Sequence, residues 1–446
     1  MELSAATLLF LSLVSLIVLL SLLGRKPAPS SRKRQPPGPR RLPFIGSLLH
    51  LLTATPQVAL RDLARKHGPV MYLRLGQVDT VVISSPAAAQ EVLRDNNLNF
   101  ASRPSLLATE IVGYGNTDIA FAPYGAYWRT LRRLCVVELL SARKVVLDTS
   151  GGLCIGDLFP SLRCVDVVTG LQRRLWRARG QLDDVFDRII AGCEARREEK
   201  KKTTTAGDDD LLSVMLRIKE DGELEFPIGT TNIKAIIVDL FTAGTETTSS
   251  TVEWIMSELM RNPEVMAKTQ AEVRQTLDNK SPEDHEGQMD KLKYTKMVIK
   301  EGMRLHPVVP LLLPRVCQET CNIGGFEVSE GSRIMVNAWA IARSPENWND
   351  AEEFRPERFE DTTVDYNGTQ FTYIPFGSGR RMCPGGTFGL AVLELLLARL
   401  LYYFDWSLPD GIKPDELDMD MIVGFTTRRR NQLHLVATPY NVPTEN

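Results

Sequence analysis

The sequence has few histidines and no paired cysteine motif. Five histidines are spread through the 446 residues without an HxxxH pair, which disfavours a histidine-rich metal site. The seven cysteines form no CxxC pair, and an odd, scattered set argues against a disulfide framework or a zinc ribbon. Cys317 and Cys321 are four positions apart, and we expect them to be packing residues. These absences indicate a chain that folds in a reducing compartment.

An excess of one charge, a nucleotide-binding motif and internal linkers are also absent. The chain carries 53 lysines and arginines against 55 aspartates and glutamates, so its charge does not point to nucleic acid as a partner. No G-x-G-x-x-G occurs, so the chain lacks the fingerprint of a dinucleotide-binding fold. No Gly/Ser-rich linker or repeat divides the chain after its N-terminus, which favours one large domain.

A charge-free stretch of membrane-spanning length lies at the N-terminus. Leu3 to Leu23 is 21 residues long, close to the roughly 20 that cross a bilayer as a helix. A cleaved signal peptide is the alternative, but its apolar part is shorter, about 7–15 residues, and follows positive charge. Here Glu2 precedes the run and basic residues follow it. We therefore expect an uncleaved, single-pass anchor at 1–24, with the rest of the chain in the cytosol.

Residues 25–46 form a basic and proline-rich hinge. Its segment Gln35-Pro36-Pro37-Gly38-Pro39 favours a stiff, extended connector. The remaining residues, 47–446, are expected to form the catalytic domain. In it, β-branched and alternating residues predict a hairpin over 70–84, a loop over 103–124 and an apolar strand over 308–315. Helical patterns are expected at 86–94, 128–133, 170–200, 211–220, 233–260, 294–305 and 391–404.

One stretch, Phe376-Gly377-Ser378-Gly379-Arg380-Arg381-Met382-Cys383-Pro384-Gly385, combines glycines with a cysteine. The glycines allow the backbone to adopt positive φ and to pass close to a flat ligand. An apolar helical run follows, so we expect the helix dipole to lower the pKa of the Cys383 thiol, and the thiolate is the form that ligates a metal. Cys383 is the one cysteine expected to be chemically exposed. A tight turn around a buried thiol is the alternative interpretation.

Polar residues interrupt the apolar helix predicted over 233–260. Ala243-Gly244-Thr245-Glu246-Thr247-Thr248 is an unfavourable choice for a buried helix interior. A threonine that bonds its own backbone can open a groove with room for dioxygen and water, and Glu246 with Thr247 can relay protons. A kinked core helix with a satisfied polar pair is the alternative.

Two further residue pairs are spaced to act on one helix face. Trp128 and Arg132 are four positions apart, so an indole N–H and a guanidinium can reach one anion, although a solvated basic face is the simpler interpretation. Glu301 and Arg304 are three apart and can form an ion pair. Gly302 lies between them and is expected to loosen its helix by about 1 kcal/mol.

These motifs, in this order, resemble those of cytochrome P-450, the haem-thiolate monooxygenases. The pattern F-x-x-G-x-R-x-C-x-G resembles the family's haem-ligand loop, and A-G-T-E-T resembles its oxygen-activating helix. The PPGP hinge is similar to that of the plant microsomal branch. The resemblance runs from the anchor to Leu435 and implies a mainly α fold with small β-sheets, the cytochrome P-450 fold with an N-terminal transmembrane helix.

The resemblance also implies a role for each motif residue. It gives haem b as the cofactor, with Cys383 as the axial thiolate and metal ligand, which favours O–O cleavage. It places Glu246 and Thr247 in oxygen activation. The other implied residues are Trp128, Arg132, Arg315, Phe376, Arg381 and Gly385 for cofactor binding, and Glu301, Arg304 and Arg358 for a buried structural triad.

The implied function is oxidation of a small lipophilic substrate with O2. Electrons would come from NADPH through a flavoprotein reductase, at the endoplasmic reticulum membrane. The sequence looks like a grass subfamily linked to diterpenoid defence compounds, so the expected substrate is a plant specialised metabolite, a terpenoid of the diterpenoid class. We expect no nucleic-acid partner.

The sequence departs from the family's pattern after Val146. Between Val146 and about Leu153, the length of two helices and part of a third is absent. A shortened, catalytically inactive membrane haem protein is therefore the alternative function. A haem-thiolate isomerase or dehydratase is a third, which Glu246 and Thr247 disfavour because such chemistry needs no proton delivery to dioxygen.

Overall fold

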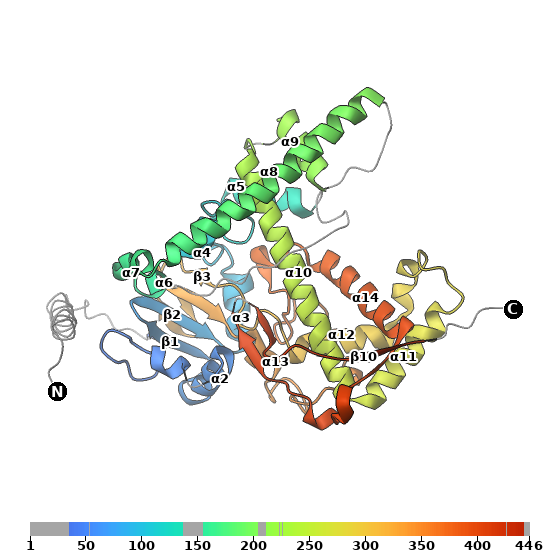
Figure 1. The fold of residues 1–446 in the computed structure, drawn as a ribbon. Coiled ribbons are helices and arrows are strands. Elements are labelled where there is room, and N and C mark those ends of the chain that lie inside the picture. The colour runs from blue at the N-terminus through green and yellow to red at the C-terminus, as the bar shows by residue number, and fades with distance from the viewer. Residues whose placement is uncertain are drawn as a thin grey trace, which may run out of the picture.

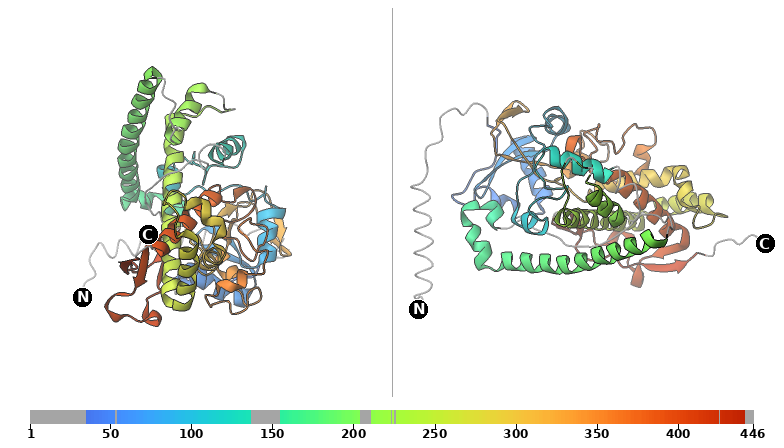
Figure 2. Two further views of the ribbon diagram at one scale, coloured as in Figure 1. Left: turned by 90° about the vertical axis from the view of Figure 1, so that its right-hand side faces the viewer. Right: turned by 90° about the horizontal axis from the view of Figure 1, so that it is seen from above.

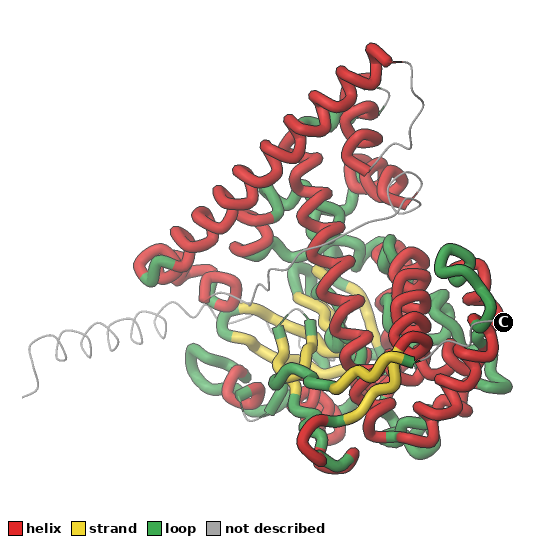
Figure 3. The backbone as a smooth tube through the Cα atoms, turned by 45° about the vertical axis from the view of Figure 1, so that its right-hand side comes forward, coloured by secondary structure: helices red, strands yellow, loops and turns green. Residues whose placement is uncertain are grey.

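The computed structural model describes residues 35–440, except 53, 137–154, 204–210, 223, 225 and 425. The expected anchor at 1–24, the first part of the hinge and the short region after Val146 lie outside the described residues. Most of the described chain is helical, as expected, and its strands form small sheets (Figure 3).

The helices follow the apolar patterns of the sequence closely. The two helices expected near 170–200 and 211–220 are present, as is the long one expected over 233–260. The α-helices are α2 (Pro56–His67), α3 (Pro86–Gln90), α4 (Leu107–Val112), α5 (Ala126–Leu134), α6 (Ile155–Leu158), α7 (Arg163–Val168), α8 (Leu171–Thr203), α9 (Leu211–Asp221), α10 (Thr230–Arg261), α11 (Pro263–Leu277), α12 (Lys293–Leu305), α13 (Ala338–Ala342) and α14 (Gly386–Tyr403).

The largest sheet has the strand order β1-β2-β6-β3. The hairpin expected over 70–84 is confirmed: β1 and β2 are antiparallel, and Gly76 has φ 63° in the turn. β6 adds in parallel to β2 and antiparallel to β3. The strands are β1 (Val70–Leu75), β2 (Val78–Ile83), β3 (Arg315–Val316), β4 (Cys321–Ile323), β5 (Phe326–Val328), β6 (Arg333–Val336), β7 (Phe404–Ser407), β8 (Met421–Val423), β9 (Thr427–Arg429) and β10 (Val436–Pro439).

Two local expectations are wrong. The apolar strand expected over 308–315 is irregular, and only Arg315 of that range belongs to a strand. Pro310 and Pro314 have no N–H to donate to a sheet, and Leu312 has φ 49°. The loop expected over 103–124 contains α4, whose N-terminus is stabilised by the hydroxyl of Thr109.

Helix α10 runs through the middle of the molecule, with the main sheet on one side and α11, α12 and α14 on the other (Figure 1). α10 ends at Arg261 because Pro263 begins α11, and proline is well accommodated at the first position of a helix. The C-terminal part of α10 packs with α11, α12 and α14 around the fully buried Leu259, Val298 and Leu397. The largest apolar cluster therefore fixes the C-terminal end of α10.

Helix α14 follows the cysteine stretch and is the one described helix apolar and long enough to cross a membrane. It buries Leu393, Leu397 and Leu401 against the core and leaves Val392 and Leu396 exposed. Its apolar composition therefore reflects, in part, its place beside α10, α11 and α12.

At the other end of α10, helices α8 and α9 project beyond the rest of the molecule (Figures 1 and 2). Phe186 and Ile190 of α8 pack with Met215 of α9 and with Ile233 and Ile236 of α10. These helices form a second apolar cluster around the N-terminal half of α10. The centre of α10, between its two buried ends, is partly exposed.

Candidate functional site

The cysteine stretch folds back on itself directly before α14. The amide of Cys383 donates to the carbonyl of Phe376 at 2.9 Å, so the two ends of the loop are joined. Gly379 has φ 71°, and a Cβ there would lie 1.9 Å from the carbonyl oxygen of Leu93, so no other residue fits. Gly385 caps α14, and the ring of Phe376 packs on Gly386 at the helix start. The loop therefore holds Cys383 at a helix N-terminus, as the sequence predicted.

Cys383 is an exposed residue and is not in a disulfide. Protein atoms around the thiol desolvate its charged form and raise its pKa, whereas the amide of Gly385 and the charge of Arg132 lower it. The expectation of a net lowered pKa is therefore wrong for the protein alone. The expectation that Cys383 is the one exposed cysteine is also wrong, because Cys164 is exposed as well.

Two buried arginines near the cysteine loop bond only to backbone carbonyls. Arg381, 7% exposed, donates to the carbonyls of Ala101, Ile119 and Ala122. Arg315, 3% exposed, donates to those of Phe100 and Ser378. Neither forms a salt bridge to a carboxylate in the described part of the chain.

A third arginine of this group, Arg103, was not singled out from the sequence. It donates to the carbonyls of Leu313, Pro314 and Ala120. Burial and the charges of Arg315 and Arg381 lower its pKa well below the ordinary value. A lone arginine before a proline carries no recognisable pattern, so only its position in space reveals it.

The guanidiniums of Arg103 and Arg381 are each disfavoured by burial and by the charges of neighbouring arginines. Burial, with the charges of Arg315 and Arg132, lowers the pKa of Arg381 to about 9, and burial lowers that of Arg315 to about 10. Burial also lowers the pKa of Arg132, while the nearby Cys383 thiol raises it. The charge of Asp118 offsets part of the cost at Arg381, and a ligand with two carboxylates would relieve the buried cations further. This donor set fits the two propionates of a haem beside the Cys383 sulfur.

Trp128 lies within this cationic group. Its indole N–H donates to the carbonyl of Ile119 at 2.9 Å, so in this structure it holds the backbone and not an external anion. The guanidinium of Arg381 lies 4.2 Å from the ring centroid, and that of Arg132 lies 5.4 Å away. The ring of Trp128 therefore stabilises the guanidiniums of Arg381 and Arg132 through cation–π contacts.

The centre of α10 has the local features expected of its polar motif. The hydroxyl of Thr247 donates to the carbonyl of Ala243 at 2.5 Å, one turn earlier. A Cβ on Gly244 would meet nothing within 4 Å, so open space lies beside the helix here. The carboxylate of Glu246 accepts a hydrogen bond from Thr426, which lies in the turn between β8 and β9. The hairpin formed by β8 and β9 thus reaches the acid of α10, a contact that no sequence motif indicates.

Glu301 lies buried between the two arginines that the sequence associated with it. Arg304 binds its carboxylate through two hydrogen bonds, of 2.6 and 2.9 Å, and Arg358 donates to it at 2.8 Å. The side chains of Glu301 and Arg304 are fully buried. Arg304 also donates to the carbonyls of Ala342 and Ala351, so the group ties α12 to the chain segment before the cysteine loop.

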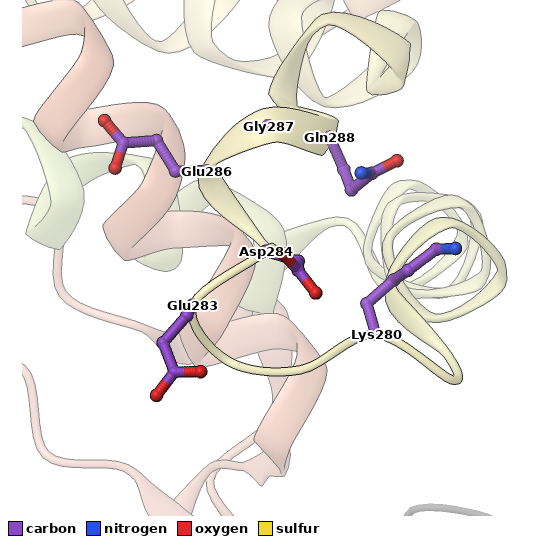
Figure 4. A pocket seen from close by; sticks show the side chains of 6 residues that line it. All are labelled: Lys280, Glu283, Asp284, Glu286, Gly287 and Gln288. Carbon is purple, nitrogen blue, oxygen red and sulfur yellow. The ribbon is translucent and has the colours of Figure 1, made fainter.

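A surface hollow lies in the loop between α11 and α12 (Figure 4). Its lining residues are charged or polar and none is a predicted site residue: Lys280, Glu283, Asp284, Glu286, Gly287 and Gln288. It therefore contributes nothing to the site around Cys383.

Comparison with known proteins agrees with this arrangement. The sequence model of the cytochrome P450 family matches residues 36–150 and 147–436. The chain is 57% identical to cytochrome P450 99A2 of Oryza sativa subsp. japonica, over 98% of this chain and 94% of that protein. It is 56% identical to the 9-beta-pimara-7,15-diene oxidase of the same plant, over 98% of each chain. A zebrafish cytochrome P450 structure with progesterone superposes with a TM-score of 0.68 at 25% identity, covering 87% of this chain and all of that one.

The same comparisons bear on the short region after Val146. The two parts of the family match meet at residues 147–150. The alignment with cytochrome P450 99A2 spans 510 positions and this chain has 446 residues, so at least 64 positions have no counterpart here. A segment that this relative has is therefore absent from this chain.

The matches cover nearly the whole chain and include its motifs, its fold and its cysteine loop. The cofactor of this family is haem held by a cysteine thiolate, and its reactions are oxidations that need O2 and a redox partner. The chain therefore belongs to the cytochrome P450 family, as a plant haem-thiolate oxidoreductase.

Proposed function

We propose that this monooxygenase hydroxylates a diterpenoid hydrocarbon, using O2 and electrons from NADPH delivered by a flavoprotein reductase. The observation that carries the substrate class is the 56% identity, over 98% of both chains, to a protein named 9-beta-pimara-7,15-diene oxidase. A hydrocarbon of this kind offers C–H bonds and no charged handle, in keeping with the apolar segments 308–313 near Arg315.

Cys383 is proposed as the axial ligand because its loop holds it at the start of α14 beside the four guanidiniums. The two propionates would be bound by Arg103, Arg132, Arg315 and Arg381. The ring of Trp128 contacts the guanidiniums of Arg381 and Arg132. Phe376 and Gly385 shape the loop. When bound, haem supplies the iron at which dioxygen is reduced and the substrate C–H bond is oxidised.

Glu246 and Thr247 are proposed to deliver protons beside that centre. The Thr247 hydroxyl bonds to Ala243 within its own helix, which leaves its oxygen able to accept and pass on a proton. The hydroxyl of Thr426 donates a hydrogen bond to the carboxylate of Glu246. This bond restrains the rotation of the carboxylate. The protein thus orients a proton donor next to open space at Gly244.

The proposed setting is the endoplasmic reticulum membrane, with a single N-terminal span and a cytosolic catalytic domain. It rests on the uncharged run 3–23 and on the basic residues that follow it. The reductase is proposed because the chain carries no G-x-G-x-x-G of its own. Glu301, Arg304 and Arg358 are proposed as the structural support of the cysteine loop.

The test begins with the carbon-monoxide difference spectrum of the reduced, membrane-expressed chain. We expect a red-shifted Soret band typical of thiolate ligation, and its loss in Cys383→Ala, with Cys164→Ala as the matched exposed-cysteine control. Turnover is then measured with reductase, NADPH and 9-beta-pimara-7,15-diene. An unchanged spectrum in Cys383→Ala would refute the ligand assignment, and a good spectrum without any oxidised diene would refute the substrate class.

A shortened, inactive haem protein is the second candidate, and the missing 64 or more alignment positions favour it. The absent segment begins in the region that follows α5, which carries Trp128 and Arg132. Absence of the thiolate-type band in the wild-type chain, together with its appearance after the missing segment of the rice relative is inserted, would establish this alternative.

A further inference from the structure

Two aspartates bind the backbone of one short segment, residues 118–122, which leads into α5. Asp239 of α10 accepts hydrogen bonds at one oxygen, Oδ2, from the amides of Ile119 and Ala120, at 2.7 and 3.0 Å. Asp118, at the start of the segment, accepts one from the amide of Phe121 at 2.5 Å. Consecutive amides of the same segment therefore point at two carboxyl groups from different parts of the chain.

The carbonyl groups of the same segment point at cations. The carbonyl of Ile119 accepts from Arg381 and from the indole of Trp128, and that of Ala122 also accepts from Arg381. The carbonyl of Ala120 accepts from Arg103. The segment thus lies between the two carboxyl groups on its amide side and the cationic group on its carbonyl side. Its position decides where Arg381 and Arg103 can lie.

The carboxyl group of Asp118 is buried, and Asp239 is half-buried. Asp118 is 2% exposed. A Cβ on Gly113 would lie 2.2 Å from Oδ2 of Asp118, so this oxygen has room only because residue 113 is a glycine. Burial raises the pKa of Asp118 to about 6. Burial, and then the charge of Asp118, raises the pKa of Asp239 well above its ordinary value.

Other ionisable groups face the pair without neutralising it. Arg381 in the cysteine loop acts on Asp118 and favours its charged form. On α5, Tyr127 faces Asp118 and Cys135 faces Asp239, and both side chains are neutral near pH 7 because their pKa values are raised. Arg381 thus favours the charged form of Asp118, and the charge of Asp118 disfavours that of Asp239.

We propose that Asp118 and Asp239 act together as positioning residues for Arg103, Arg381 and Trp128. Both carboxyl groups bind amides of the segment 118–122, and the carbonyls of that segment bind these three side chains. The link to haem binding rests on the proposed function, whereas the pairing itself concerns the protein alone.

The pair makes the segment sensitive to pH in a defined direction. A carboxyl whose pKa is raised by folding stabilises the folded state at low pH and loses that contribution as the pH rises. Asp118 loses it as the pH approaches about 6, and the raised pKa of Asp239 adds a loss in the same direction. The second ionisation places two like charges on the same segment, so we expect the amides of Ile119 and Ala120 to lose protection in alkaline solution.

The experiment is hydrogen exchange of the full chain in detergent from pH 6 to 9, corrected for intrinsic exchange rates. The readout is the peptide that contains residues 113–124. In Asp239→Ala, the amides of Ile119 and Ala120 lose their acceptor, and we expect exchange about tenfold faster. Asp239→Asn keeps an oxygen acceptor in the same place, so it should restore protection and remove the pH dependence. Asp184→Ala removes an exposed carboxylate on α8 and is the matched control.

A second readout tests the link to the cofactor. In wild type we expect the thiolate-type carbon-monoxide band to decline as the pH rises to 9, and we expect Asp239→Asn to hold it constant. A chain without that band at any pH would refute the proposed function while the exchange data still test the pair. Wild-type exchange in Asp239→Ala, or a wild-type pH profile of exchange in both Asp239→Asn and Asp118→Asn, would overturn the positioning role and its pH dependence.

Discussion

Gly302 lies on α12 next to Glu301 and faces α10. A Cβ at this position would lie 2.5 Å from Cγ1 of Ile255 and 3.3 Å from its Cδ1. Ile255 is fully buried in the largest apolar cluster, so it has little room to move. Gly302 therefore lets α12 approach α10 closely, although a glycine weakens an isolated helix.

We predict that Gly302→Ala destabilises the protein. The intrinsic helix preference of alanine contributes about 1 kcal/mol in its favour. Overpacking against a rigid neighbour costs about 1–3 kcal/mol, so the net loss is about 1 kcal/mol. Gly192→Ala in α8 is the matched control, because a Cβ there meets nothing within 4 Å, and it should stabilise by about 0.5–1 kcal/mol.

The assay is chemical unfolding of the full chain in detergent, followed by circular dichroism. If overpacking is the cause, Gly302→Ala combined with Ile255→Ala should be less destabilised than the sum of the two single variants. Stabilisation by Gly302→Ala equal to that of Gly192→Ala would refute the argument. It would show that Ile255 moves freely and that the helix propensity alone decides the outcome.

Variants at Glu301, Thr247 and Thr426 test the other parts of the site. Glu301→Gln leaves the buried Arg304 and Arg358 without a counterion. It should lower the free energy of unfolding by about 3–5 kcal/mol in the same assay, whereas Glu360→Gln, at an exposed position, should change it little. Thr247→Ala should keep the haem spectrum but divert NADPH electrons from product to hydrogen peroxide, and full coupling in this variant would contradict its proton-relay role. Thr426→Val should raise peroxide formation less strongly and Thr426→Ser should restore coupling, because only the valine lacks the donor to Glu246.

The local elements of this fold were predictable because their signals are local. The alternating residues of 70–84 specify a hairpin, and Asn262-Pro263 marks the end of α10. The errors arose where tertiary context overrides composition. The apolar residues of 308–314 suggested a strand, but prolines and a positive φ at Leu312 prevent regular pairing, and the residues pack as an irregular segment.

The candidate site was predictable only in part. Cys383, Glu246 and Thr247 stand in dense motifs that can be recognised in one window of sequence. Arg103 and Thr426 stand in no such motif. An aspartate in the apolar N-terminal half of α10, Asp239, was a signal that could have been noticed, because a carboxyl removed from water needs a partner.

The sequence by itself determined the helices, the main hairpin and the cysteine loop, because periodicity, glycine and proline act over a few residues. Only the tertiary structure decided which charges meet. Arg103 and Arg381 are separated by most of the chain, yet both bond to the segment 118–122 that Asp239 holds from α10. Such contacts depend on how the helices and the sheet pack together. No local sequence pattern encodes the free-energy cost of burying a charge beside another that is distant in sequence.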